Sequence, residues 1–148
     1  MYTQSMSVDF VCVDHINMFV KNLEESIDFY QRVFGTDGEI KDSGERKGIR
    51  WVIIGIPNKF YFCLYEWPHP EAIYETDALH INHIGFYVQD FDETVRRIEQ
   101  LNIQVQYRAQ PISWNNRNGT SRSLYIDDPN GYKIEFSEKL GGGLDQPA

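Results

Sequence analysis

The sequence is poor in the residues on which several common classes of protein depend. It contains only two cysteines, Cys12 and Cys63, which are too few for a disulfide framework. It has no apolar run long enough to span a bilayer and no recognisable signal peptide, so we expect a reduced, cytoplasmic protein. Positive charge is also scarce, because the formal net charge is −8 and the isoelectric point is about 4.9. Such a surface would repel the phosphates of nucleic acids and anionic membranes, which leaves a small molecule as the expected partner.

What is present predicts a folded domain with an internal repeat. Hydrophobic residues make up 41% of the 148 positions and aromatic residues 14%, which is enough to build a core. Residues 14–25 and 82–93 correspond to one another at a constant offset of 68 positions. Each copy starts with a histidine in a strand-like segment and runs into an amphipathic helix, where Asn22 and Asp90 are placed as N-terminal caps.

The chain after each helix predicts a series of short strands. Gly35 and Asn102 are suitable ends for the two helices, and turn signals then follow at residues 37–38, 57–58, 118–119 and 129–131. Each copy therefore predicts a βαβββ module. We expect an α+β fold in which two modules form a cupped, mostly antiparallel, barrel-like cleft with the helices outside. Within a single domain over 1–148, the predicted parts are a first module (8–67), a linker (68–79), a second module (80–139) and a flexible tail (140–148).

Strand alternation predicts which side chains share a surface. The apolar positions of the two histidine strands would lie under the helices: Ile16, Met18 and Val20 in one copy, and Ile84, Phe86 and Val88 in the other. His15, His83 and, from the last strand, Glu135 would then point to the opposite, concave face. Two imidazoles and a carboxylate can hold a divalent metal and leave positions open for substrate. A lone histidine is more often a hydrogen-bonded core residue, but recurrence at equivalent places favours metal ligation.

The final strands of the two modules also align, residues 59–66 against 131–138, at an offset of 72. This alignment places Cys63 opposite Glu135. The parity of Cys63 predicts that it faces the cleft, although a single cysteine in an apolar strand is more often a small buried hydrophobe than a metal ligand. Glu66 has the other parity, so we expect it on the outer face.

Together these residues resemble the vicinal oxygen chelate superfamily of glyoxalase, fosfomycin-resistance, extradiol dioxygenase and bleomycin-binding proteins. The similarity covers residues 10–138 and includes the two histidine strands and the segment 125–135 (YIDDPNGYKIE), which looks like the family's turn into its ligand strand. The resemblance implies that His15, His83 and Glu135 bind one divalent ion, such as Mn, Ni, Zn or Fe. It also places Cys63 where glyoxalase I has a fourth ligand, which counts against that reaction.

The same resemblance suggests a reaction class without naming one reaction. Tyr125 stands where three-ligand members have a tyrosine that touches substrate, so Tyr125 and Glu135 are the expected catalytic residues. The expected substrate contacts are Asn17, Trp51, Cys63, Tyr65, Trp114 and Arg122. No subfamily fits every position, since no histidine follows His83 and the loop lacks the lysine of some fosfomycin enzymes. The leading hypothesis is a metal-dependent lyase, thiol- or water-adding enzyme or ring-cleaving dioxygenase whose small substrate binds through oxygen, with a thiol as a candidate co-substrate.

Two alternatives concern the class of function and the assembly. The rival function is metal-free sequestration of a ligand, as in bleomycin-binding proteins, through stacking on aromatic side chains: Trp51, Tyr61, Tyr65, Tyr87 and Trp114. For the assembly we expect a homodimer, because the superfamily closes its modules either within one chain or between two. In the exchanged form, His15 would come from one chain and His83 with Glu135 from the other.

Overall fold

The computed structural model describes residues 8–69, 80–108, 112–113 and 120–139 of the chain. Trp114, most of the predicted linker and the predicted tail lie outside these ranges. The elements before the linker are β1 (Ile16–Val20), α1 (Leu23–Phe34), the 3-10 turn η1 (Gly35–Asp37), β2 (Glu39–Arg46), β3 (Ile49–Ile56) and β4 (Phe60–Glu66). Those after it are β5 (Ile84–Tyr87), α2 (Phe91–Gln100), β6 (Tyr107–Arg108), β7 (Ile112–Ser113), β8 (Thr120–Asp127) and β9 (Lys133–Lys139).

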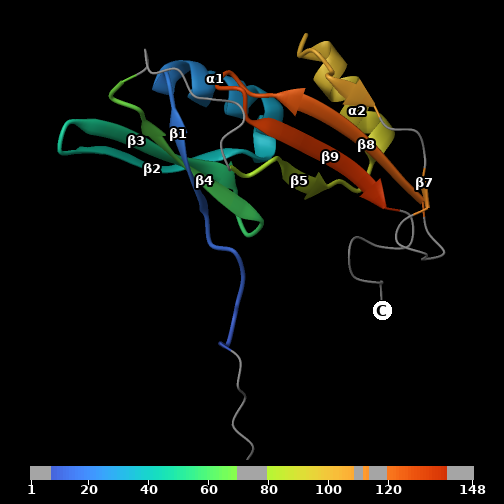
Figure 1. The fold of residues 1–148 in the computed structure, drawn as a ribbon, viewed down its shortest axis with the longest axis horizontal. Helices are drawn as coiled ribbons and strands as arrows, with labels where there is room; N and C mark the ends of the chain where they lie inside the picture. The colour runs from blue at the N-terminus through green and yellow to red at the C-terminus, as the bar shows by residue number, and fades with distance from the viewer. Residues whose placement is uncertain (1–7, 70–79, 109–111, 114–119, 140–148) are drawn as a thin grey trace, which may run out of the picture.

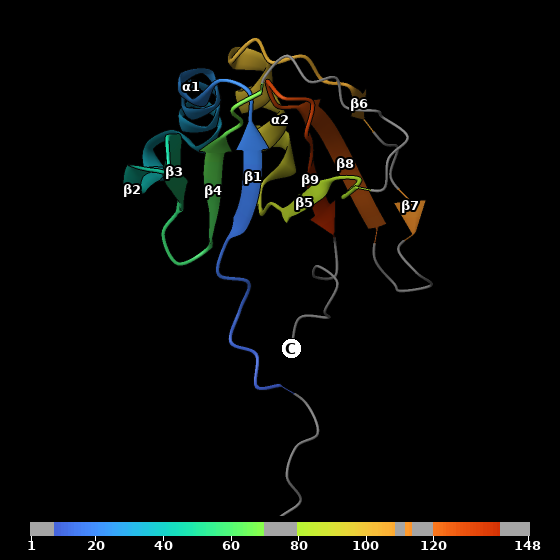
Figure 2. The same ribbon diagram turned by 60° about the vertical axis from the view of Figure 1, so that its left-hand side comes forward.

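The strands form two sheets of related topology. One sheet has the order β1-β4-β3-β2 and the other the order β5-β9-β8-β6, with β7 also paired to β8. In both, the first strand runs parallel to the last and the remaining pairings are antiparallel. The predicted α+β fold is confirmed, with the two sheets cupped rather than closed into a barrel (Figures 1 and 2). The second module differs from the first in having two short strands, β6 and β7, where the first has the long β2.

Local sequence sets the ends of both helices as predicted. The Asn22 side chain accepts a hydrogen bond from the Glu25 amide at 2.9 Å, and the Asp90 side chain accepts one from the Glu93 amide at 3.0 Å. At the other end α1 stops before Gly35, whose φ of 67° is in the left-handed region that glycine adopts without strain. Helix α2 stops in the same way, two residues before Asn102 with φ 57°.

The core lies on the helix-facing sides of the two sheets and is continuous between modules. Its buried side chains include Met18, Val20, Tyr30, Val52, Ile54, Phe62, Leu64, Ile98, Leu124, Ile126, Ile134 and Phe136. The rings of Phe60 and Phe86, one from each module, have centroids 4.7 Å apart. The two modules therefore share apolar surface that neither could bury alone. In the described part of the chain, neither helix has the length and apolarity needed to cross a membrane.

The turn between β8 and β9 joins the second module to α1 of the first. The hydroxyl of Tyr30 donates to the buried carboxylate of Asp128 at 2.8 Å, and the backbone amides of Asn130 and Tyr132 donate to the same carboxylate. The Asn130 side-chain amide also donates to Ser26 Oγ at 3.1 Å. We call this group of residues the Asp128 turn contact. It holds the two strands that carry Tyr125 and Glu135 against the first module.

Candidate functional site

The faces of the two sheets that point away from the helices carry several of the predicted site residues. In the second sheet Ile134 and Phe136 are buried on the helix side, so Glu135 between them faces the other way. Its neighbours in the sheet are Gly85 on β5 and Tyr125 on β8. Backbone register therefore brings these three positions to one place on this face.

His83, Glu135 and Ser123 form a cluster with short contacts there. Nε2 of His83 lies 2.8 Å from Oε2 of Glu135, while Ser123 Oγ donates to the other carboxylate oxygen, Oε1, at 2.7 Å. A Cβ atom at Gly85 would lie 3.4 Å from Oε2, an ordinary van der Waals contact distance, so the carboxylate lies directly beside the glycine. The ring of Tyr125 meets that of His83 edge-on, with centroids 5.6 Å apart. The geometry joins two predicted ligands and the predicted catalytic tyrosine.

The residue before each histidine orients its ring. His83 Nδ1 lies 2.8 Å from Oδ1 of Asn82, and His15 Nδ1 lies 2.7 Å from Oδ2 of Asp14. Each of these oxygens can accept a hydrogen bond from an Nδ1–H group, and a ring held in that tautomer offers Nε2 as a metal ligand. At His83, Nε2 is also the nitrogen that lies 2.8 Å from the Glu135 carboxylate. This donor arrangement suits a divalent metal.

His15 does not join this cluster within the chain. It precedes β1 and is half exposed, and among the residues that the structure describes no three of the metal-binding types His, Cys, Asp and Glu come together. The predicted convergence of both histidines with Glu135 is thus only partly seen in a single chain. Asn17 and His83, however, line the same cavity of about 230 Å³, which lies between β1 and residues 80–84.

The equivalent face of the first sheet is mostly aromatic and apolar. Cys63 pairs with Asn17 on one side and Ile53 on the other, and the neighbouring pair on this face is Trp51 and Tyr65. Cys63 is buried, and this burial raises the pKa of its thiol, which favours the neutral form over the thiolate that metals bind. Cys63, Asn17, Trp51 and Tyr65 therefore share one face of the first sheet. His83 and Glu135 belong to the second module.

Arg122 corrects the sequence analysis. It lies on the helix side of β8, where its guanidinium contacts Glu138 at 2.8 Å and Asp92 at 3.2 Å. Strand parity explains this result, since Arg122 is an odd number of positions from Tyr125 and must face the other way. It therefore lies on the face opposite to Tyr125 and Glu135. Glu66 makes the matching contacts in the first module, with Arg50 and the α1 amide of Leu23, and so lies on the outer face as predicted.

Sequence reasoning missed Ser123 and Asn82. Ser123 stands two positions before Tyr125 on the same strand, so alternation alone would have placed it on the site face. Its contact with Glu135 depends on the diagonal register of β8 and β9, which alternation does not predict. Asn82 directly precedes His83, as Asp14 directly precedes His15. This repeated pattern of a side-chain oxygen before each histidine could have indicated its role.

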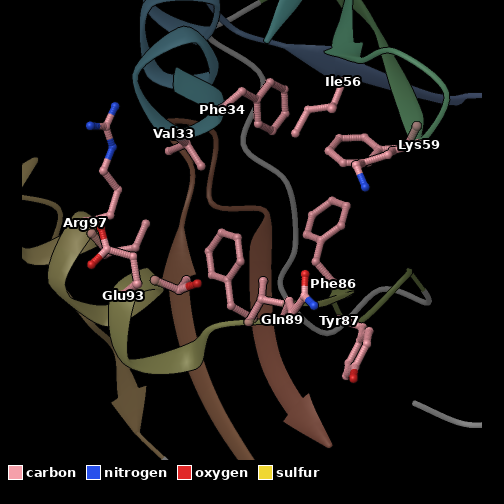
Figure 3. A pocket seen from close by; sticks show the side chains of 14 residues that line it. Val33, Phe34, Ile56, Lys59, Phe86, Tyr87, Gln89, Glu93 and Arg97 are labelled. Carbon is pink, nitrogen blue, oxygen red and sulfur yellow. The ribbon is translucent and has the colours of Figure 1, made fainter. Parts of the chain in front are cut away.

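A larger hollow lies apart from this cluster, at the junction of the modules (Figure 3). It has a volume of about 590 Å³ and is lined mostly by apolar side chains from the ends of α1 and β3, from β5 and from α2. Phe34, Ile56 and Phe86 point into it, with Glu93 and Arg97 at its rim. Among the described residues, none of the predicted metal ligands, catalytic residues or substrate contacts lines this hollow, although Tyr87, predicted as a stacking residue for the rival function, does.

Known proteins match both the sequence and the fold. The family model described as "Glyoxalase/Bleomycin resistance protein/Dioxygenase superfamily" matches residues 13–136. Lactoylglutathione lyase of Neisseria meningitidis is 28% identical over 132 residues, which cover 86% of this chain and 91% of that protein. Lactoylglutathione lyase of Escherichia coli is 26% identical over 133 residues, covering 87% and 93%.

Solved structures show the same fold at lower identity. The fosfomycin resistance protein FosX of Listeria monocytogenes, crystallised with Mn(II) and sulfate, has a TM-score of 0.63 and 22% identity, covering 93% of this chain and 97% of its own. A glyoxylase/bleomycin resistance protein/dioxygenase domain from Frankia has a TM-score of 0.73 and 16% identity, covering 91% and 96%. The repeat, the two cupped sheets and the match over residues 13–136 lead to one conclusion: this chain belongs to the Glyoxalase/Bleomycin resistance protein/Dioxygenase superfamily, the vicinal oxygen chelate group that its sequence resembles.

Proposed function

We propose that this protein is a divalent-metal-dependent enzyme that acts on a small substrate bound through oxygen. The observation that carries the proposal is the pair formed by Nε2 of His83 and Oε2 of Glu135, 2.8 Å apart. With Nδ1 of His83 beside Asn82 Oδ1, the pair offers one nitrogen and one oxygen donor close together. Such mixed donors accept several first-row ions, and Mn(II) is the ion found with FosX.

Each residue around the pair has a proposed role in binding the metal or the substrate. The bound metal would polarise substrate oxygens and stabilise negative charge on them. Tyr125, beside His83, would donate a hydrogen bond to the same developing charge. Glu135 and His83 hold the ion, and Gly85 keeps the approach to the carboxylate open. The similarity to lactoylglutathione lyase and FosX supports lyase chemistry or addition of a thiol or water as the first reactions to examine.

The third ligand would be His15 of a second copy of the chain. Within one chain His15 stands apart from the cluster, yet its ring is held through Nδ1 in the same way as that of His83. The segment leading to it carries exposed apolar side chains, Phe10 at 82% and Val11 at 96% exposure, that a partner would cover. A homodimer with exchanged modules would complete the triad.

Metal content of the purified protein tests the proposal. We expect about one divalent ion per chain after incubation with Mn²⁺, and almost none in Glu135→Gln, which keeps the shape but removes the charge. Glu45→Gln, on the exposed strand β2, is the matched control and should bind as the unaltered protein does. Failure to bind Mn²⁺, Ni²⁺, Zn²⁺ or anaerobic Fe²⁺ would overturn the proposal. Binding would direct activity screens to glutathione hemithioacetals, fosfomycin with thiols or water, and catechols.

Mixed dimers test the shared site. If the triad spans two chains, a dimer of one His15→Ala chain with one Glu135→Gln chain retains one intact site, because both changes fall in the other. Differently tagged chains, co-purified, should then hold about one metal per two chains, whereas each parent variant holds almost none. An empty mixed dimer would show that each site is built within one chain.

A second candidate function rests on the aromatic face of the first sheet. Trp51 and Tyr65 lie side by side there, and Phe19 packs edge-on against Tyr65 with centroids 6.5 Å apart. Such a face can stack a planar ligand without a metal, as expected of a sequestering protein. Trp51→Ala would then abolish ligand binding that Glu135→Gln leaves intact. The enzyme proposal predicts that both variants affect substrate turnover.

A further inference from the structure

We infer that Ser123 is a positioning residue that sets the orientation in which Glu135 binds the metal. This inference rests on the proposed function and adds a residue that neither the repeat nor the family resemblance indicates. Ser123 is buried, with 7% exposure, and its hydroxyl donates to Oε1 of Glu135 at 2.7 Å. The other oxygen, Oε2, is the one directed at His83. The serine thus occupies one carboxylate oxygen and leaves the other for the ion.

Backbone register explains why this contact fixes an orientation. Ser123 pairs with Ser137, one inward-facing position beyond Glu135 on β9, whereas His83 precedes β5 on the opposite side of β9. The carboxylate is therefore held from two diagonal directions, one oxygen by each neighbour. Gly85, directly beside Glu135 on β5, has no side chain that could do this, and the ring of Tyr125 on β8 meets the ring of His83 edge-on. Without the hydroxyl, the carboxylate could rotate and present either oxygen, or both.

The repeat supports a linked role for serine and carboxylate. At the offset of 72, Glu135 corresponds to Cys63 and Ser123 corresponds to Trp51. The module with a carboxylate at this place also has the hydroxyl that holds it, and the module without the carboxylate has neither. If Ser123 only filled space, an apolar side chain would serve equally well at a buried strand position.

Metal affinity of matched variants tests the inference. We expect Ser123→Ala to bind Mn²⁺ about tenfold more weakly in a competition titration with a chelator, as is usual when the partner of a ligand is removed. Ser123→Thr keeps the hydroxyl and suits a strand, so it should restore affinity. Ser137→Ala is the control, because it removes a buried hydroxyl on the same face that donates to the Phe86 carbonyl at 3.5 Å.

The outcomes separate this inference from the proposal beneath it. Unchanged Mn²⁺ affinity in Ser123→Ala, or an equal loss of affinity in Ser137→Ala, would overturn the positioning role of Ser123. The proposed function would still be supported if the unaltered protein bound metal and Glu135→Gln did not. Absence of metal binding in the unaltered protein would instead remove the proposed function, and this inference with it. The melting temperatures of the metal-free variants should all lie close together, which separates a change in the site from a change in the fold.

Discussion

The inward faces of the two sheets have the same backbone plan and opposite chemistry. Equivalent positions hold Trp51 and Ser123, Cys63 and Glu135, Asn17 and Gly85, and Tyr65 and Ser137, in the first and second modules respectively. The first sheet is thus an aromatic and apolar wall, and the second a polar surface with a histidine and carboxylate pair. A shared topology sets where the side chains stand, and the side chains alone decide which face can hold an ion.

The contacts between the modules differ in a related way. In the second module the turn before the last strand carries Asp128, which reaches Tyr30 on α1. In the first module, Ile56 occupies the place of Asp128, and on α2 Ile98 occupies the place of Tyr30. These two apolar side chains cannot form a hydrogen bond and instead line the hollow of about 590 Å³. The junction between α1 and the Asp128 turn is closed by polar contacts, and the equivalent junction between α2 and the end of β3 is open and apolar. We therefore expect the two junctions to contribute unequally to stability.

The largest expected effect concerns the closed junction. Asp128→Ala should lower the free energy of unfolding by about 3 kcal/mol, because Tyr30 and the amides of Asn130 and Tyr132 lose a buried, charged acceptor. Denaturant titration would measure this. Lys59→Ala, in the corresponding turn and exposed, should change stability by no more than about 0.5 kcal/mol. Equal losses in the two variants would contradict the unequal roles of the turns.

An intermediate effect is expected when the first face is made more like the second. Cys63→Glu places a carboxylate at the position equivalent to Glu135, where in the exchanged dimer it would add a ligand and raise Mn²⁺ affinity about tenfold. Because Cys63 is buried, the metal-free variant should be less stable than Cys63→Gln, which has the same size and no charge. Thermal unfolding with and without Mn²⁺ compares them. If Mn²⁺ did not reduce the difference in melting temperature between Cys63→Glu and Cys63→Gln, the first face would not contribute to the site.

The smallest effect is expected when α1 loses the hydroxyl of Tyr30, which the equivalent residue of α2, Ile98, also lacks. Tyr30→Phe should cost about 1 kcal/mol, since it removes a donor from Asp128. Burial, aided by Asp128, raises the pKa of Tyr30 well above its ordinary value. Above about pH 10 the unfolded chain releases this proton while the folded chain retains it, so stability falls as pH rises, by up to about 1.4 kcal/mol per pH unit.

Phenylalanine cannot titrate, so the difference in stability between the unaltered protein and Tyr30→Phe should shrink above about pH 10. Urea titrations at pH 8 to 11 would show it. A difference that stayed constant over this range would mean that Tyr30 ionises equally in both states.

Sequence predicted most of the fold and about half of the geometry of the site. The repeat, the helix caps at Asn22 and Asp90 and the position of Glu135 follow from local periodicity, which acts over a few residues. Arg122 was predicted as a substrate contact without regard to its parity, and it lies on the face opposite to Tyr125. The separation of His15 from His83 could not be predicted, since alternation describes each sheet and not how two sheets pack.

The Asp128 turn contact also shows how the two halves of an internal repeat can diverge. Two halves that arose as copies would at first be interchangeable, and a chain built from either half twice over would fold equally well. Here only the first half carries the phenol of Tyr30 and only the second carries the carboxylate of Asp128. A chain with two first halves would have two phenols facing isoleucine, and one with two second halves would have two carboxylates that lack the phenol donor. The copies have become complementary parts, so neither can now replace the other.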